Sequence, residues 1–98
     1  MNLVSGYPRA AAISQLLHRA GIRRRSSAQR SAGFRAFQGS PDAARVRVYG
    51  TPTQRAAIKA AVCAALIGRY TVIGMHDEDD VLTVLRLGET ALRKYGLE

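Results

Sequence analysis

The run TPTQRAAIKAAVCAALIG, residues 51–68, constrains the possible folds of this chain more than any other stretch. Thr51 is a preferred residue for capping a helix, Pro52 fits the first helical position, and Gln54 is placed to complete a capping box. The helix is expected to continue through RAAIKAAVCAALI and to stop at Gly68. The run therefore predicts one helix in the middle of the chain, with separate structure before and after it.

The inward face of this middle helix is predicted to be apolar and slim. Its alanines allow close approach to a sheet, while Arg55 and Lys59 mark the solvent-exposed side. Cys63, the only cysteine of the chain, is expected to be a small buried hydrophobic residue rather than a nucleophile. The inward stripe is expected to consist of Ile58, Ala61, Val62, Ala65, Leu66 and Ile67.

A β-hairpin is predicted directly before the middle helix. The run GFRAFQ at 33–38 and the run ARVRVYG at 44–50 flank GSPD, in which Pro41 and Asp42 are typical turn residues. The second run alternates, so its apolar side chains are expected on one face and its two arginines and Tyr49 on the other.

Two more strands are predicted after the helix, YTVIGM at 70–75 and VLTVLRL at 81–87, because both are rich in branched residues. The acidic run HDEDD at 76–80 is expected to be the loop that joins them. The last strand is apolar at both odd and even positions. It is therefore expected to be central in the sheet or covered on both faces.

The first helix is predicted over residues 8–20, with Pro8 at its first position. Gly21 and Ile22 are typical of a Schellman stop, in which the apolar residue folds back on the helix. The polar, arginine-rich residues 23–32 are expected to form a loop. The apolar stripe of this helix is expected to be Ile13, Leu16, Leu17 and Ala20.

The predicted order is α-β-β-α-β-β, with a short final helix after residue 88. Such an order indicates an α+β fold of two layers, in which helices pack on one face of a mostly antiparallel four-stranded sheet. The second strand, the middle helix and the third strand are expected to form a crossover unit. The 98 residues are expected to make a single domain.

The excess of positive charge lies entirely in the first half of the chain. Residues 1–50 hold nine arginines and one acidic residue, whereas residues 51–98 hold six basic and six acidic residues. The net charge of +8 therefore belongs to the basic half. Such asymmetry predicts a basic face directed at nucleic acid or another anionic surface.

The alternation of the hairpin places arginines and aromatic rings on the same outward face, which the arginine-rich loop could extend. Guanidinium groups pair with phosphates, and rings stack on bases, so we expect a nucleic-acid-binding surface. Single-stranded nucleic acid or an RNA loop suits this surface best, whereas a duplex could be held by charge alone. The sequence does not distinguish DNA from RNA as the ligand. The candidate residues are Arg23, Arg24, Arg25, Arg30, Arg35, Phe37, Arg45, Arg47 and Tyr49.

Catalysis, cofactors and metals are not expected. The chain has no phosphate-binding glycine loop, and no serine, cysteine or carboxylate lies in a recognisable catalytic motif. His18 is explained as a favourable cation near a helix C-terminus. The acidic run 76–80 lacks the glycine turn and the distal glutamate of a calcium loop, so a charged turn is the better interpretation.

Two alternatives remain open beside nucleic-acid binding. The apolar strand 81–87 and the alanine-rich helix also fit a protein-interaction module that binds an acidic partner or self-associates. Residues 1–41, with no acidic residue, also have the composition of an organellar transit peptide. No apolar run reaches the roughly eighteen residues of a membrane span. The single cysteine favours a reducing, cytoplasmic setting.

The runs ISQLLHRAGIRRRSS, SAGFRAFQ, RVRVYG and GRYTVIG resemble small uncharacterised proteins of actinobacteria and their phages, a resemblance that implies no function. The leading helix and the basic hairpin also resemble HicA-type toxin ribonucleases. Gly33 and Phe34 stand where that family has its catalytic histidine after Gly-Ser, which removes the ribonuclease activity from the comparison. Without that activity, the resemblance implies only a fold similar to that of double-stranded-RNA-binding domains.

Overall fold

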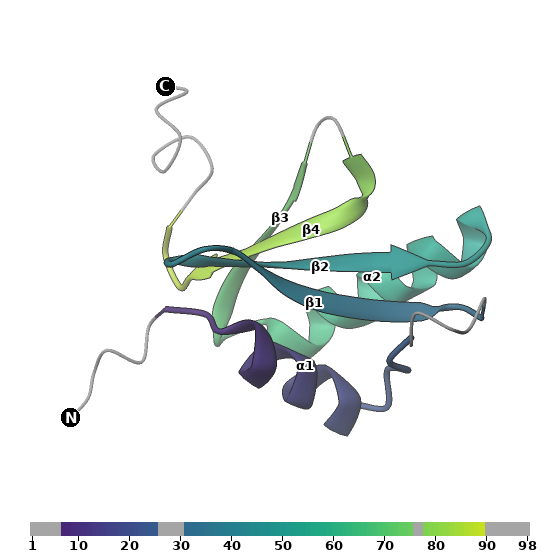
Figure 1. Cartoon of the computed structure of the whole chain (residues 1–98), viewed down its shortest axis with the longest axis horizontal. Coiled ribbons are helices and arrows are strands. Elements are labelled where there is room, and N and C mark those ends of the chain that lie inside the picture. The colour runs from purple at the N-terminus through teal and green to yellow at the C-terminus, as the bar shows by residue number, and fades with distance from the viewer. Residues whose placement is uncertain (1–6, 26–30, 76–77, 90–98) are drawn as a thin grey trace.

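A four-stranded antiparallel sheet with two helices on one of its faces makes up the fold (Figure 1). The computed structural model describes residues 7–25, 31–75 and 78–89. The predicted α+β class is confirmed, whereas the expected final helix lies outside the described residues. In chain order the elements are α1 (Ala10–Arg19), β1 (Gly33–Ser40), β2 (Ala43–Tyr49), α2 (Pro52–Leu66), β3 (Tyr70–Met75) and β4 (Glu78–Arg86).

The strands lie in the order β1-β2-β4-β3. Both β2 and β3 pair antiparallel with β4, so β2 and β3 run parallel to each other with β4 inserted between them. The expected crossover through α2 therefore spans a third strand. The central place of β4 explains its apolar residues on both faces, and all five residues from Val81 to Leu85 are buried. The strand also begins at Glu78, inside the run predicted as a loop.

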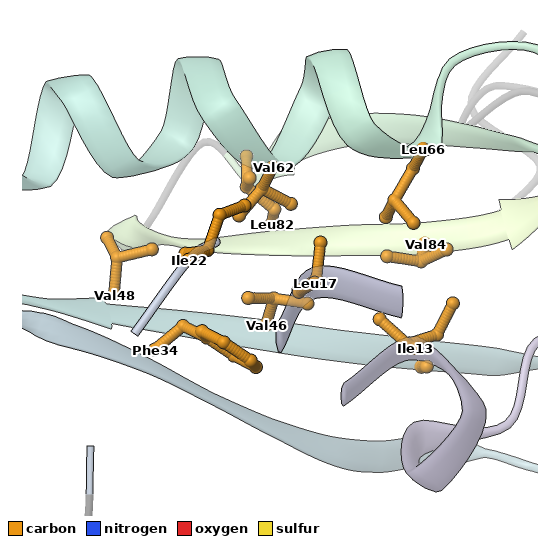
Figure 2. Close-up of a cluster of buried hydrophobic side chains, with 11 residues drawn as sticks. Ile13, Leu17, Ile22, Phe34, Val46, Val48, Val62, Leu66, Leu82 and Val84 are labelled. Carbon is orange, nitrogen blue, oxygen red and sulfur yellow. The ribbon is translucent and has the colours of Figure 1, made fainter. Parts of the chain in front are cut away.

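The apolar core lies between the two helices and the sheet (Figure 2). Each element contributes side chains at its own periodicity, every second residue in the strands and every third or fourth in the helices. The described residues contain no helix long and apolar enough to cross a membrane. The core cluster consists of Ile13, Leu17, Ile22, Phe34, Ala44, Val46, Val48, Val62, Leu66, Leu82 and Val84.

Helix α2 begins as predicted, but its buried face is narrower than expected. The Thr51 amide donates to Gln54 Oε1 at 2.9 Å, and the Gln54 amide donates to Thr51 Oγ1 at 3.2 Å, which completes the capping box. Only Val62 and Leu66 of the helix are buried, with Ile58 and Ala65 partly buried beside them. The helix meets the sheet along one line of side chains.

Three residues of α2 and its end were predicted wrongly to face inward. Ala61 and Cys63 are exposed, and Ile67 keeps 78% of its surface in contact with solvent. Ile67 is the C-cap and has left the helical conformation, so the helical spacing no longer applies to it. Ala61 and Cys63 flank Val62 in sequence, and adjacent helical residues point in different directions.

Helix α1 starts two residues later than predicted, and a side chain from β1 binds its first amide. The Ala10 amide donates to Gln38 Oε1 at 2.9 Å, and Gln38 Nε2 donates to the Pro8 carbonyl at 3.1 Å. Pro8 is therefore buried ahead of the helix and does not occupy its first turn.

The other end of α1 follows the predicted Schellman stop. The Ile22 amide donates to the Leu17 carbonyl and the Gly21 amide to the His18 carbonyl, both at 3.0 Å. Gly21 adopts a φ of 88°, which a residue without a side chain reaches at little cost. Ile22 is consequently drawn into the core, and the chain is directed toward the outer edge of β1.

Candidate functional site

The face of the sheet opposite the helices carries the alternating basic and aromatic residues of the hairpin. Along β2, Val46 and Val48 point into the core, whereas Arg45, Arg47 and Tyr49 remain partly exposed on the other face. Both helices lie on the Val46 side, and in the described part of the chain no helix covers the opposite side (Figure 1). We call this opposite side the open face.

The register of β1 and β2 determines which residues meet on the open face. Arg35 lies across from Arg47, Phe37 lies across from Arg45, and Gly33 lies across from Tyr49. Cross-strand partners have Cβ atoms about 5 Å apart, so these side chains form one continuous surface. Arg35 and Phe37 are exposed, and Phe37 keeps 39% of its surface in contact with solvent.

A further arginine reaches the open face from outside the hairpin. Residues 23–25, predicted as part of a loop, instead run parallel to the start of β1, with Arg24 paired with Phe34. The Phe34 amide donates to the Arg23 carbonyl at 3.0 Å, and the Arg25 amide donates to the Phe34 carbonyl at 2.9 Å. The loop prediction therefore missed the isolated bridge at Arg24 and the two bonds beside it.

The Arg25 guanidinium stacks on the Tyr49 ring, 4.0 Å from the ring centroid. Gly33 makes this approach possible, because a Cβ there would lie 2.7 Å from the Arg23 carbonyl oxygen and 3.1 Å from Arg25 Cβ. The role of Gly33 was missed by the sequence analysis. Its signal was present in the sequence, since a glycine at the start of a strand often marks a close approach of another backbone.

The remaining predicted residues do not join this group. Arg23 lies at the outer edge of β1 and lines a hollow with Gln54 and Ile58 of α2. Arg24 lies beside the group and not in it, since the hollow that it lines with Ser14 of α1 is also lined by Arg25 and Arg35. Arg30 lies outside the described residues. The open-face cluster is therefore defined here as Arg25, Arg35, Phe37, Arg45, Arg47 and Tyr49.

One arginine of the cluster is held by a carboxylate of β4. Arg47 Nη1 donates to Asp80 Oδ2 at 3.1 Å, and both side chains are about one-third exposed, at 34% and 36%. An ion pair with this much solvent around it contributes about 0.2–1 kcal/mol.

The floor of the open face is formed by β4. Val81, Thr83 and Leu85 are buried there, with Arg47 across from Val81 and Arg45 across from Thr83. Arg47 reaches over β4 to Asp80, whereas the stem of Arg45 lies against Gly39 of β1, where an added Cβ would be 3.0–3.3 Å from Arg45 Nε, Cγ and Cδ. Thr83 Oγ1 and Arg45 Nε are both buried and have no hydrogen-bond partner within the described residues.

Replacing Thr83 by valine is expected to raise the free energy of unfolding by about 1 kcal/mol, because a buried hydroxyl without a partner is lost and its shape is kept. Urea unfolding followed by circular dichroism measures the change. A decrease would show that the hydroxyl has a partner that the valine removes. Thr71→Val is the matched control, since the Thr71 hydroxyl accepts from the Gly88 amide and its loss should be destabilising.

The residues considered for catalysis and metal binding do not converge. His18 and Cys63 are exposed on different helices, and His76 lies outside the described residues. Among the residues that the structure describes, no group of three or more histidine, cysteine, aspartate or glutamate side chains could hold a metal ion.

Comparison with known proteins gives no relative for this arrangement. No family model matches the chain, and neither the curated proteins nor the solved structures include a significant match.

Proposed function

We propose that this protein binds nucleic acid through the open-face cluster, without catalysing a reaction. The observation that carries the proposal is the convergence of four arginines and two aromatic rings on the face of the sheet opposite the helices. These residues come from three segments of the chain, residues 23–25, β1 and β2. Arginine pairs bidentately with phosphate, and aromatic rings offer faces on which bases stack.

The parts of the cluster have different roles in this proposal. Arg35 and Arg45 contact phosphates from neighbouring strands, and Arg47 adds a third contact after exchanging its bond to Asp80. Phe37 provides the stacking surface, because it is the most exposed ring of the hairpin at 39%. Arg25 covers one face of the Tyr49 ring and thereby fixes its orientation, and the edge of its guanidinium makes the fourth phosphate contact.

A single strand or a loop is the ligand class that this surface favours. The cluster lies on the face of a four-stranded sheet, which is wider than the single helix or two-stranded ribbon that a major groove admits, so base edges within a duplex are out of its reach. Unstacked bases, in contrast, can lie on the sheet while their phosphates follow the arginines.

Fluorescence anisotropy with labelled single-stranded and duplex DNA and RNA, titrated at several salt concentrations, tests the proposal. Neutralising four phosphates predicts a logarithmic salt slope of about −3 for single strands. Tighter binding to the single strands than to the duplexes is expected. A flat salt response, or no binding at low salt, would contradict the proposal.

Replacing Phe37 by leucine is expected to weaken binding to single strands by about 1–3 kcal/mol, or roughly five- to 150-fold, because a stacking platform is lost. The leucine keeps an apolar residue at this partly exposed position, so the fold is retained. Binding to a duplex should change little, since stacking on Phe37 requires an unpaired base. Equal losses of affinity for single strands and duplexes would contradict a stacking role for Phe37.

A further inference from the structure

We infer that a hollow at the outer edge of β1 binds the terminal phosphate group of a nucleic-acid strand, an inference that rests on the proposed function. The hollow has a volume of about 170 Å³, and three arginines line it. β1 is the first strand in the sheet order, so the open face ends at its outer edge. A strand bound on the open face can therefore reach the hollow with one of its ends. The residues that line the hollow are Ser14, Arg24, Arg25, Phe34, Arg35 and Ala36.

The three arginines reach the hollow from two segments that are adjacent in the fold. Arg24 pairs with Phe34, and the Arg25 amide donates to the Phe34 carbonyl at 2.9 Å, so both arginines lie beside β1. Arg35 follows Phe34 on β1 and belongs to the open face. Ser14 adds a hydroxyl from α1, which packs against β1 (Figure 1). The hollow thus lies between α1 and the open face.

The positive charge around the hollow is not compensated within the described residues. None of the residues that line the hollow is acidic, and none of its three arginines forms an ion pair with a described carboxylate. Like charges that are held close together repel one another, and a recess lined by one sign of charge concentrates the electric field. A bound anion relieves this repulsion.

Arg25 also carries a hydrogen-bond donor that lacks an acceptor. Its Nε is buried and has no partner within the described residues, although the stacking of the guanidinium on Tyr49 holds the side chain in place. Buried polar groups are normally hydrogen-bonded, and an unpaired one is often explained by an ion or a ligand. Arginine binds phosphate side by side, with two N–H groups donating to two oxygens. A phosphate oxygen is therefore the acceptor that suits this Nε.

Size and charge favour a terminal phosphate over other anions. Sites for small organic ligands have volumes of about 300–1,000 Å³, so the hollow, at about 170 Å³, is too small for a whole nucleotide. A phosphate monoester carries a charge of about −1.5 to −2 at pH 7, whereas a phosphate within a strand carries a single negative charge. Three arginines therefore attract the end of a strand more strongly than its interior.

The open face continues from the hollow toward the rest of the cluster. Phe37 lies two residues beyond Arg35 on the same face of β1, a distance of about 7 Å along the strand. The base next to the terminal phosphate can stack on Phe37, while the phosphates that follow meet Arg45 and Arg47 on β2. Binding in the hollow thus fixes one end of the nucleic acid at β1 and sets its direction across the sheet.

Competition binding with the full chain tests the inference. Single strands of about eight nucleotides, as DNA and as RNA, displace an internally labelled strand. They share one sequence and carry a 5′-phosphate, a 3′-phosphate or hydroxyls at both ends. At least one phosphorylated strand is expected to bind about tenfold more tightly than the hydroxyl-ended strand. Whether the 5′ or the 3′ phosphate gives the gain shows the direction of the bound strand.

Two variants show whether the hollow causes this preference. Arg24→Gln is expected to reduce the preference for the phosphorylated strand to about twofold, and Ser14→Ala is expected to reduce it to about a third of its original value. The ratio of the two affinities is the readout, because the loss of one charge weakens the binding of both strands. Arg69→Gln is the matched control, since Arg69 is exposed before β3 at the opposite edge of the sheet. This control should retain the tenfold preference.

The outcomes separate this inference from the proposed function. Equal affinities for phosphorylated and hydroxyl-ended strands would overturn the inference alone, and so would a preference that Arg24→Gln does not reduce. No binding of any strand would overturn the proposed function together with the inference. Thermal unfolding should show that all three variants fold, because none of the three substituted residues is buried.

Discussion

Phe34→Ala is expected to lower the free energy of unfolding by about 3–5 kcal/mol, a large part of the 5–15 kcal/mol typical of a small domain. Phe34 is 1% exposed and is the largest fully buried side chain of the core. Its backbone amide and carbonyl also hold residues 23–25 against β1, so a displaced strand would loosen that segment. Urea unfolding followed by circular dichroism measures the loss.

Phe37→Ala is the natural control, because the same substitution is made three residues away on the opposite face of the same strand. Phe37 is 39% exposed and belongs to the open face, so its loss should cost about 1 kcal/mol or less. Similar losses for the two substitutions would contradict the assignment of the two faces of β1.

Replacing Arg25, Arg35 and Arg45 together by glutamine is expected to weaken single-strand binding by about 100-fold at 0.1 M salt. Each phosphate contact accounts for about 0.7 of the logarithmic salt slope of a single strand, which corresponds to roughly fivefold in affinity at that salt concentration. The salt slope itself should fall by about 2. Anisotropy titrations at several salt concentrations measure both quantities.

The matched control removes three exposed arginines from other parts of the surface: Arg9 at the N-cap of α1, Arg19 at the end of α1, and Arg69 before β3. Its net charge falls by the same amount, so any effect of overall charge is reproduced. Binding by the control should weaken by only a few-fold, with a nearly unchanged salt slope. If the two triple variants weakened binding equally, affinity would depend on the net charge of the protein and not on the position of the arginines on the open face.

Local signals in the sequence predicted the elements and their ends where the deciding contacts are short-range. The capping box of Thr51 and Gln54 and the Schellman stop at Gly21 each depend on residues within one or two turns, and both are present. The hairpin with Pro41 and Asp42 in its turn follows from alternation and turn chemistry. The central position of β4 followed from its apolar residues on both faces.

Contacts between residues far apart in the sequence could not be predicted from local signals. Gln38 of β1 binds the start of α1, some thirty residues earlier in the chain, and nothing in the local sequence near Pro8 indicates it. The pairing of Arg24 with Phe34 and the stacking of Arg25 on Tyr49 likewise arise only once the hairpin is formed. The exposure of Cys63 depends on how little of α2 the sheet covers.

The candidate site was predictable in part for the same reason. Alternation along two strands placed Arg35, Phe37, Arg45, Arg47 and Tyr49 together, since it depends on strand geometry alone. The arginines of residues 23–25 were predicted to extend the same surface, yet their edge pairing sends only Arg25 onto the Tyr49 ring. The bond of Arg47 to Asp80 requires the neighbouring position of β4, which the sequence order does not specify.

Backbone amide shifts of the isotope-labelled protein, recorded by NMR during titration with a single-stranded oligonucleotide, test the open-face cluster most directly. The account predicts that the largest shifts fall on residues 25, 35, 37, 45, 47 and 49, and that the amide shifts of the exposed residues of α2 do not change. Shifts concentrated on α1 or α2 would contradict it. The absence of shifts when the oligonucleotide is in large excess over the protein would also contradict it.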